Sequence, residues 1–168
     1  MNPQAVYGII FSENKKEVLL VQRRDLPVWV LPGGGLDLKE TPAEGAIREV
    51  EEETGYQVKV VRQVAEYLPV NRLTQKTYFF ECMITGGAAT LNSEAKNIRY
   101  FPVTSLPSTL PPPFPLWIAD ALSENQEVLV KKIEGVTYLT FFKLLFKHPI
   151  LVLRYLLTKL GIRFNDKT

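Results

Sequence analysis

Apolar residues recur along the first hundred positions of the chain in short runs that are typical of β-strands. Polar or glycine-containing stretches separate five such runs, at residues 5–11, 17–23, 56–70, 76–84 and 97–103. A shorter extended piece at 28–32 ends at a proline that is followed by three glycines. The polar sequence SENKK between the first two runs predicts that these two strands form a hairpin.

The strongest helix signal lies at residues 42–54, where both ends carry boundary residues. Thr41 can act as the N-cap, Pro42 takes the first helical position, and Glu44 completes a capping box with the threonine. Gly55 is placed to end the helix in the left-handed conformation. We therefore predict a helix over 42–54.

A second helix is predicted at 116–129, where it can pack back on the strands. It follows a proline-rich stretch at 106–116 that cannot form a regular helix or a central strand. Strands of mixed direction, with helices between and after them, predict an α/β fold in the form of a sandwich.

The 42–54 helix carries an unusual number of glutamates. With about 100° of rotation per residue, Glu49, Glu52 and Glu53 share one face, whereas Glu51 points away from it. A solvated helix surface usually intersperses lysine with glutamate. Three clustered carboxylates cost stability unless they bind a hard cation such as Mg²⁺ or Mn²⁺. On the helix alone, a solvated face and a metal site both remain open.

The residues upstream of the glutamates extend this pattern. The sequence GGLDLKETPAEGAIREVEEETGY, from Gly34 to Tyr56, resembles the Nudix box. The matching positions are Gly34, Glu40, Arg48, Glu49, Val50, Glu52, Glu53 and Gly55. The resemblance implies a Nudix-type α/β/α sandwich with a mixed sheet. It also implies a hydrolase that cleaves a diphosphate bond in a nucleoside diphosphate linked to another moiety.

The same resemblance implies a metal site for Mg²⁺ or Mn²⁺. Glu52 and Glu53 are then expected to be the principal ligands, and the Gly33 carbonyl a further one. Glu49 is expected to be a third ligand or to orient the attacking water. Glu94, which precedes a late strand, is the candidate for an extra ligand or a general base, although a solvated loop acid is an equal alternative.

Other box positions are expected to support the site. Arg48 is expected to hold a box glutamate in place, because its planar fork suits a carboxylate. Glu40 is expected to support the loop or the metal shell, and Gly34 to allow the loop to turn tightly beside the helix. Lys39 departs from the glycine that many members of the family have at this position.

Several further residues carry two interpretations each. Arg23 and Lys39 are candidates for contacts with substrate phosphates, but a solvent-facing strand end also explains the arginine. Trp29 and Tyr67 could stack on a nucleotide base, and core packing is the better explanation for both. The rival to hydrolysis is a non-catalytic Nudix-like module that binds a nucleotide, although such a module has no need to keep the costly acid face.

Composition limits the remaining possibilities. The chain has 168 residues, of which 46% are hydrophobic and 23% charged, and it can bury a core. The net charge of +2 gives no indication of nucleic acid, and no specific nucleic-acid partner is expected. The single cysteine, Cys82, lies in an apolar run and is expected to be a buried thiol. We read no basic leader before a long apolar segment, and we expect a cytoplasmic protein.

The sequence predicts two parts, a Nudix domain at 1–130 and a basic, apolar helical tail at 131–168. One helix is expected from residue 135 to about His148, and a second after a break at Pro149. The uncharged runs are shorter than the roughly 20 residues of a transmembrane helix. The tail is expected to pack on its own domain or mediate homodimerisation, to make peripheral membrane contact, or to bind another partner.

Overall fold

The computed structural model describes residues 3–139, which form eight strands and two helices. The strands are β1 (Gln4–Ile10), β2 (Glu17–Arg23), β3 (Trp29–Val30), β4 (Gly33–Gly35), β5 (Tyr56–Leu68), β6 (Lys76–Gly87), β7 (Ala95–Pro102) and β8 (Leu129–Lys132). The helices are α1 (Pro42–Thr54) and α2 (Phe114–Leu122).

The strands form two sheets. The larger sheet has the order β4-β1-β6-β5-β8, with parallel pairs between β1 and β6 and between β5 and β8. Its other pairs are antiparallel, so it is a mixed sheet, as the sequence predicts. The smaller sheet has the order β3-β2-β7 and is wholly antiparallel.

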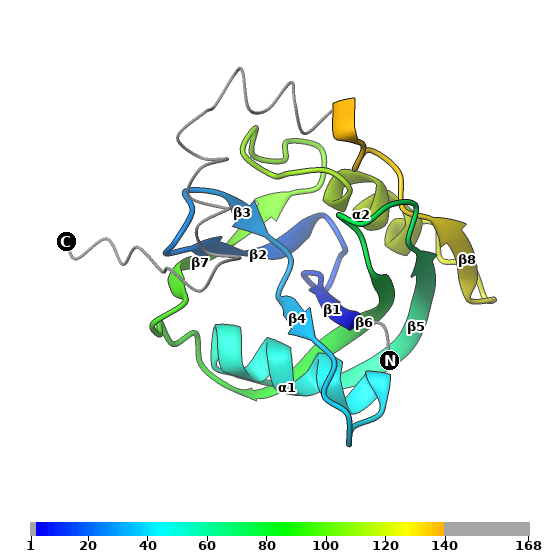
Figure 1. Ribbon diagram of the computed structural model, residues 1–168. Coiled ribbons are helices and arrows are strands. Elements are labelled where there is room, and N and C mark those ends of the chain that lie inside the picture. The colour runs from blue at the N-terminus through cyan, green and yellow to red at the C-terminus, as the bar shows by residue number, and fades with distance from the viewer. Residues whose placement is uncertain (1–2, 140–168) are drawn as a thin grey trace.

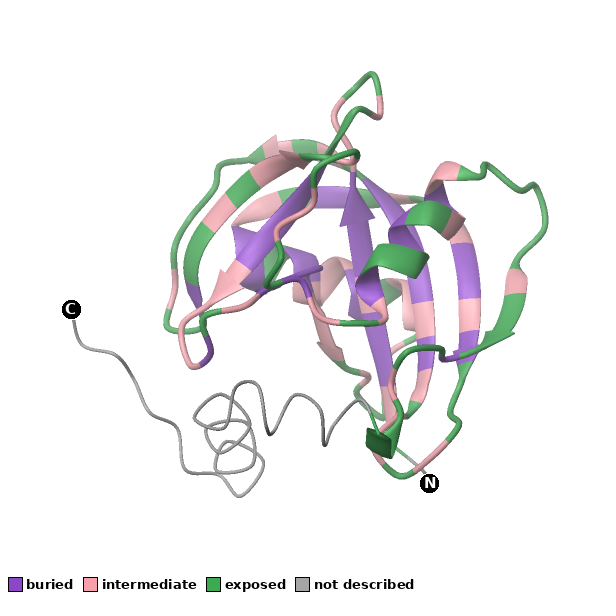
Figure 2. Ribbon diagram, turned by 90° about the horizontal axis from the view of Figure 1, so that it is seen from above, coloured by how far each residue is buried: buried purple, intermediate pink, exposed green. Residues whose placement is uncertain are grey.

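Alternate residues of β1 face two different hydrophobic clusters, as expected for a strand with two buried faces. Val6 and Ile10 pack with Val50 of α1 on one face of the large sheet. Ile9, on the other face, belongs to the cluster that contains Trp117 of α2 and residues of the small sheet. The large sheet therefore lies between α1 on one side and α2 on the other (Figure 1), which is the predicted α/β/α arrangement, and the small sheet contributes residues to both clusters. Figure 2 shows that the buried residues concentrate in the strands.

Trp29 and Tyr67, for which the sequence allowed either stacking on a nucleotide base or packing in the core, belong to this core. Tyr67 is 1% exposed, and its ring stacks on Trp117 at 4.4 Å between centroids. Trp29 is buried and meets Phe101 edge to face. Cys82 is a buried free thiol, and burial raises its pKa to about 12, so it is protonated at neutral pH.

The predicted hairpin between the first two strands is wrong. β1 and β2 join different sheets, and only an isolated bridge between Phe11 and Val18 connects them beside the turn. The two strands diverge because β1 pairs with β4 and β6, whereas β2 pairs with β3 and β7.

The second helix is shorter than predicted and begins earlier, at Phe114 rather than at residue 116. It ends at Leu122, residues 123–128 form no helix or strand, and Leu129, the last residue of the predicted helix, begins β8. β8 crosses the predicted domain boundary at 130, and Ile133 beyond it is buried in the core. The predicted tail helices lie mostly in 140–168, outside the described residues, and residues 135–137, where the first was expected to begin, are not helical. Within 3–139, neither helix has the length and hydropathy needed to cross a bilayer.

Candidate active site

Local interactions define both ends of α1, which carries the glutamates. The Thr41 hydroxyl accepts a hydrogen bond from the Glu44 backbone N–H, and the Glu44 carboxylate accepts one from the Thr41 N–H at 2.8 Å. These contacts form the predicted capping box. Gly55 ends the helix with φ at 75°, in the left-handed region. The helix therefore begins and ends where the sequence predicts.

The three glutamates that we call the acid face, Glu49, Glu52 and Glu53, differ in exposure. The Glu53 residue is only 8% exposed, and the Glu49 side chain is 14% exposed. The Glu52 side chain is 63% exposed. Glu51 points elsewhere, and its carboxylate accepts a long hydrogen bond from the Val58 N–H. The helix thus presents two shielded carboxylates and one open one.

Arg48 connects the acid face to the preceding loop. Its Nε and Nη2 atoms donate to the two oxygens of Glu40 at 3.0 and 2.6 Å, which is a bidentate ion pair. Its Nη1 atom donates to Glu49 at 2.9 Å and to Glu52 at 3.3 Å. Nη2 also donates to the Gly35 carbonyl oxygen at 3.0 Å. A single guanidinium thus contacts two members of the acid face and the loop before α1, in agreement with its predicted clamping role.

Glu40 anchors the other end of this arrangement. Besides Arg48, it accepts the Asp37 backbone N–H at 2.8 Å. The Arg48 guanidinium and this N–H hold the Glu40 pKa below its usual value, so the carboxylate stays charged. Glu40 supports the loop, which is one of the two roles expected for it.

β4 lies directly against the acid face. The Gly33 backbone N–H donates to Glu53 at 3.0 Å. A Cβ atom on Gly34 would lie 2.6 Å from both carboxylate oxygens of Glu49, far inside van der Waals contact. Only glycine at this position allows the Glu49 carboxylate to rest on the strand.

Burial raises the pKa of two acids of the site, Glu49 and Glu53. Burial, followed by the charges of Glu49 and Glu94, raises the Glu53 pKa to about 7, against the opposing effects of the Gly33 N–H and Arg23. Burial also raises the Glu49 pKa against the opposing effect of Arg48, and the charges of Glu52 and Glu94 add smaller contributions in the same direction as burial. The negative charge at this site is therefore incompletely compensated by the protein.

Three candidate site residues lie outside α1, namely Glu94, Arg23 and Lys39. Glu94 is an exposed residue just before β7, and its charge acts on both Glu49 and Glu53. Arg23, at the end of β2, acts on Glu53 but is itself held by Asp25 through two hydrogen bonds of 2.8 and 2.7 Å. Lys39 is exposed in the turn before α1.

Residues 1–123 match the sequence model of the NUDIX domain. The chain belongs to the Nudix family. Since Nudix members hydrolyse phosphorus-containing anhydrides, the protein is a Nudix hydrolase. The acid face, together with Arg48, is the candidate site for that chemistry.

Individual relatives share much of this Nudix domain. A Bacillus subtilis (strain 168) protein that bears the provisional name of an 8-oxo-dGTP diphosphatase is 31% identical over 130 residues, or 77% of this chain and 87% of the relative. An ADP-ribose pyrophosphatase of Methanocaldococcus jannaschii is 33% identical over 109 residues, covering 61% and 63%. The crystal structure of an ADP-ribose pyrophosphatase from Streptococcus suis 89-1591 superposes with a TM-score of 0.62 at 26% identity, covering 79% of this chain and 99% of that one.

The side chains of the Nudix site are of the type that binds a divalent cation, but they are not arranged around a single point. Among residues 3–139, no three carboxylate, imidazole or thiolate groups converge on one point as metal ligands do. The ion pairs that Arg48 forms with Glu49 and Glu52 account for this arrangement, because they direct both carboxylates toward the guanidinium. Even so, carboxylate oxygens are the donors that Mg²⁺ and Mn²⁺ prefer, and burial raises the pKa of Glu49 and Glu53, a cost to their charged forms that a bound cation would offset.

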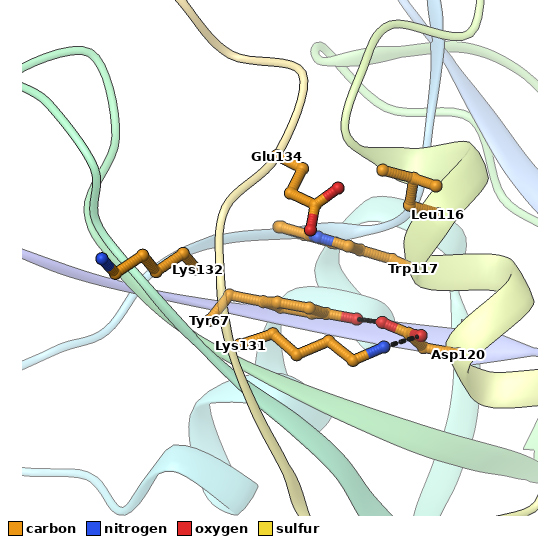
Figure 3. Close-up of a pocket in the computed structure, with 7 residues that line it drawn as sticks. All are labelled: Tyr67, Leu116, Trp117, Asp120, Lys131, Lys132 and Glu134. Carbon is orange, nitrogen blue, oxygen red and sulfur yellow. Dashed lines mark hydrogen bonds and ion pairs between the residues drawn. The ribbon is translucent and has the colours of Figure 1, made fainter.

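A hollow of about 70 Å³ lies elsewhere on the Nudix domain, between α2 and the segment that contains β8 (Figure 3). Its wall includes the stacked rings of Tyr67 and Trp117, and Asp120 accepts hydrogen bonds from the Tyr67 hydroxyl and from Lys131. No member of the acid face lines it. Tyr67 and Lys131 both bond to Asp120, and the hollow is separate from the acid face.

Sequence reasoning missed two residues near the acids of this Nudix site. Asp25 holds Arg23, and Asn92 connects the loop of Glu94 to α1. The sequence LNSEAK around Asn92 contains the kind of short polar turn in which an asparagine side chain bonds the backbone two residues on. That signal indicates a turn, but it does not reveal the bond to α1.

Proposed function

We propose that this Nudix hydrolase uses Mg²⁺ or Mn²⁺ to cleave the diphosphate bond of a nucleoside diphosphate that is linked to another moiety. The observation that carries the proposal is the pair of shielded carboxylates, Glu49 and Glu53, whose charges the protein leaves incompletely compensated. A pure binding module gains nothing from this arrangement, which costs stability without a cation. A divalent ion would convert that cost into binding energy.

Four groups would hold the metal. Glu52 and Glu53 are proposed as principal ligands, Glu49 as a third ligand or as a group that orients the water, and the Gly33 carbonyl as a further ligand. The exposed Glu52 side chain has room to turn from Arg48 toward an ion beside Glu53. Arg48 keeps its two bonds to Glu40 in such a rearrangement, so the loop stays in place.

A divalent ion held by these groups would supply charge neutralisation of the diphosphate and a lowered pKa for a water that attacks phosphorus in line. The chain supplies the remaining functions. Glu94 is proposed to accept a proton from the attacking water, as a new P–O bond forms and the bridging P–O bond breaks to release the second phosphate. Arg23 and Lys39 are proposed to contact the substrate phosphates, since a cation at either position attracts them.

The proposed substrate class follows from the names of the relatives together with the charge at the site. 8-oxo-dGTP and ADP-ribose share a nucleoside bound to a chain of phosphates, while their remaining parts differ. A site made of metal and cations recognises the shared part. We therefore propose a nucleoside diphosphate derivative and test a panel of ADP-ribose, NADH, dinucleoside polyphosphates, nucleoside triphosphates and nucleotide sugars.

Glu53→Gln tests the proposal directly. The substitution preserves the size of the side chain and removes the carboxylate, so kcat on the best substrate should fall by roughly 10³-fold or more while the protein remains folded. Mononucleotide release is measured with Mg²⁺ and with Mn²⁺, and circular dichroism checks the fold.

Glu51→Gln is the matched control, because Glu51 lies two residues away on the same helix and points away from the acid face. Its variant should keep kcat within about twofold of the wild type. Full activity of Glu53→Gln, or wild-type activity in the presence of a chelator, would refute the metal assignment.

A further inference from the structure

The loop between β6 and β7, residues 88–94, is attached to the C-terminal end of α1. The last carbonyl groups of a helix have no partners within the helix and need others. The Thr90 backbone N–H donates to the Thr54 carbonyl at 2.9 Å, and the Asn92 side-chain amide donates to the Glu52 carbonyl. The loop therefore satisfies two carbonyls at the end of the helix that carries the acid face.

The other end of the Asn92 side chain holds the backbone of Glu94. Its Oδ1 atom accepts the N–H groups of Glu94 and Ala95 at 2.8 and 2.6 Å. Because one end of the amide faces a carbonyl and the other faces two N–H groups, its orientation is set by its partners. A single side chain thus links the backbone of Glu52 to the backbone of Glu94, two acids that lie far apart in the sequence.

Arg24 holds the same segment from the opposite side. Its backbone N–H donates to the Glu94 carbonyl at 2.8 Å. Its Nη2 atom donates to the carbonyls of Asn92 and Ala95, each at 3.2 Å. Glu94 is exposed, yet its backbone is held on both sides. Such an arrangement is unnecessary for an acid that only faces solvent.

We propose that Asn92 is a positioning residue, which sets the Glu94 carboxylate relative to the acid face by joining their backbones. This inference rests on the proposed function of the site. Its physical basis is that a catalytic group displaced by about 1 Å can lose roughly 100-fold in rate. Asn92 needs no contact with substrate or metal for this role, since it acts through Glu52 and Glu94.

Two substitutions of Asn92 separate its two ends. Asn92→Ala removes all of its bonds, whereas Asn92→Asp keeps the acceptor for the Glu94 N–H and loses the donor to the Glu52 carbonyl. Both variants should lower kcat by about 10- to 100-fold, with KM changed less than about threefold. Ser93→Ala, an exposed neighbour in the same loop, is the matched control and should behave as the wild type.

A second measurement does not depend on turnover. Mn²⁺ binding to the full chain, followed by electron paramagnetic resonance, should weaken by roughly 10-fold in Asn92→Ala, as is usual when a residue that orients metal ligands is removed. Thermal unfolding checks that both variants fold. A merely structural role would lower the melting temperature and leave Mn²⁺ affinity and kcat unchanged at a temperature where the variants are folded.

A double-mutant cycle tests whether Asn92 acts through Glu94. If it does, the Asn92→Ala/Glu94→Gln variant should match Glu94→Gln alone within about twofold, rather than lose the product of the two factors. Full additivity, or wild-type kinetics in either Asn92 variant, overturns the inference. Wild-type activity of Glu94→Gln beside an inactive Glu53→Gln also overturns it, while the proposed function stands. An active Glu53→Gln overturns the proposed function itself.

Discussion

Arg48 and Glu53 both lie among acidic side chains, and the pKa of each is raised. Arg48 is surrounded by carboxylates, and its pKa is raised, with the hydrogen bond to Glu40 as the main cause, so it remains charged. Glu53 is buried with one backbone N–H as its hydrogen-bond donor, and its pKa is raised to about 7. The box pattern predicted both residues. It could not predict their burial, because burial depends on how β4 packs on α1.

The raised pKa of Glu53 predicts how the stability of the metal-free protein depends on pH. A carboxyl group whose pKa is about 7 when folded and near 4.5 when unfolded binds more protons in the folded state between these values. The cost of keeping its charged form buried is therefore absent below pH 4.5, grows as pH rises, and reaches its full value of about 3 kcal/mol above pH 7. The folded protein should lose stability from pH 5 to pH 8.

Urea unfolding in the presence of a chelator measures this effect at pH 5 and pH 8. Glu53→Gln provides the comparison, because it lacks the titrating group while other groups are unchanged. The free energy of unfolding of the wild type should fall relative to that of the variant as pH rises. Parallel pH profiles of the two proteins would contradict the assigned burial cost.

At the scale of elements, the sequence predicted α1 to the residue but misjudged partners that are distant in the chain. The helix limits follow from contacts within a few residues, such as the Thr41–Glu44 capping box. The separation of β1 from β2 follows from pairing with strands far away in sequence, which no local pattern records. β4 consists of three glycines and has no apolar alternation to detect. β8, with the sequence LVKK, is too short to be distinguished from a helix end.

Gly55 connects α1 to β5 and packs against the loop that carries Glu94, and this contact supports a prediction. Gly55 has φ at 75°, and a Cβ atom there would lie 2.6 Å from the Ala88 carbonyl oxygen. Gly55→Ala should therefore lower the free energy of unfolding by about 2 kcal/mol, from backbone strain together with the clash. It should also lower kcat, because the displaced loop carries Glu94.

Gly35→Ala is the control for the effect on stability, since a Cβ atom on Gly35 meets nothing within 4 Å. Its free energy of unfolding should stay within about 0.5 kcal/mol of the wild type. Denaturant titration of both variants measures the difference. Equal stabilities of the Gly55 and Gly35 variants would show that the left-handed turn and the loop contact are dispensable.

At the scale of the whole molecule, the candidate site and the core are contained in the described part of the chain. The site residues come from β2, β4, α1 and the loops next to them. The core cluster that contains α2 extends to Ile133, and Val136 packs against it. The Asn71 side chain also donates to the Val136 carbonyl at 2.7 Å. The folded unit thus needs residues beyond the predicted boundary at 130.

These contacts decide where the tail can be removed. A cut after Glu134 would lose the bonds that Val136 makes, whereas a cut after Leu139 keeps them. The variant that ends at Leu139 should keep kcat/KM within about twofold and should unfold cooperatively, because the proposed metal and substrate contacts all lie before β7. A loss of more than about 10-fold in kcat/KM would show that residues 140–168 contribute to the site.

The same pair of proteins tests the proposals for the tail. If the basic, apolar segment makes peripheral membrane contact, the full chain should co-sediment with vesicles that contain anionic lipids, and the shortened chain should not. If the segment instead mediates homodimerisation, light scattering should give twice the monomer mass for the full chain alone. Equal sedimentation, with a monomer mass for each protein, would leave packing on the chain's own domain or binding of another partner. Packing should raise the melting temperature of the full chain above that of the shortened one, whereas binding of another partner should not.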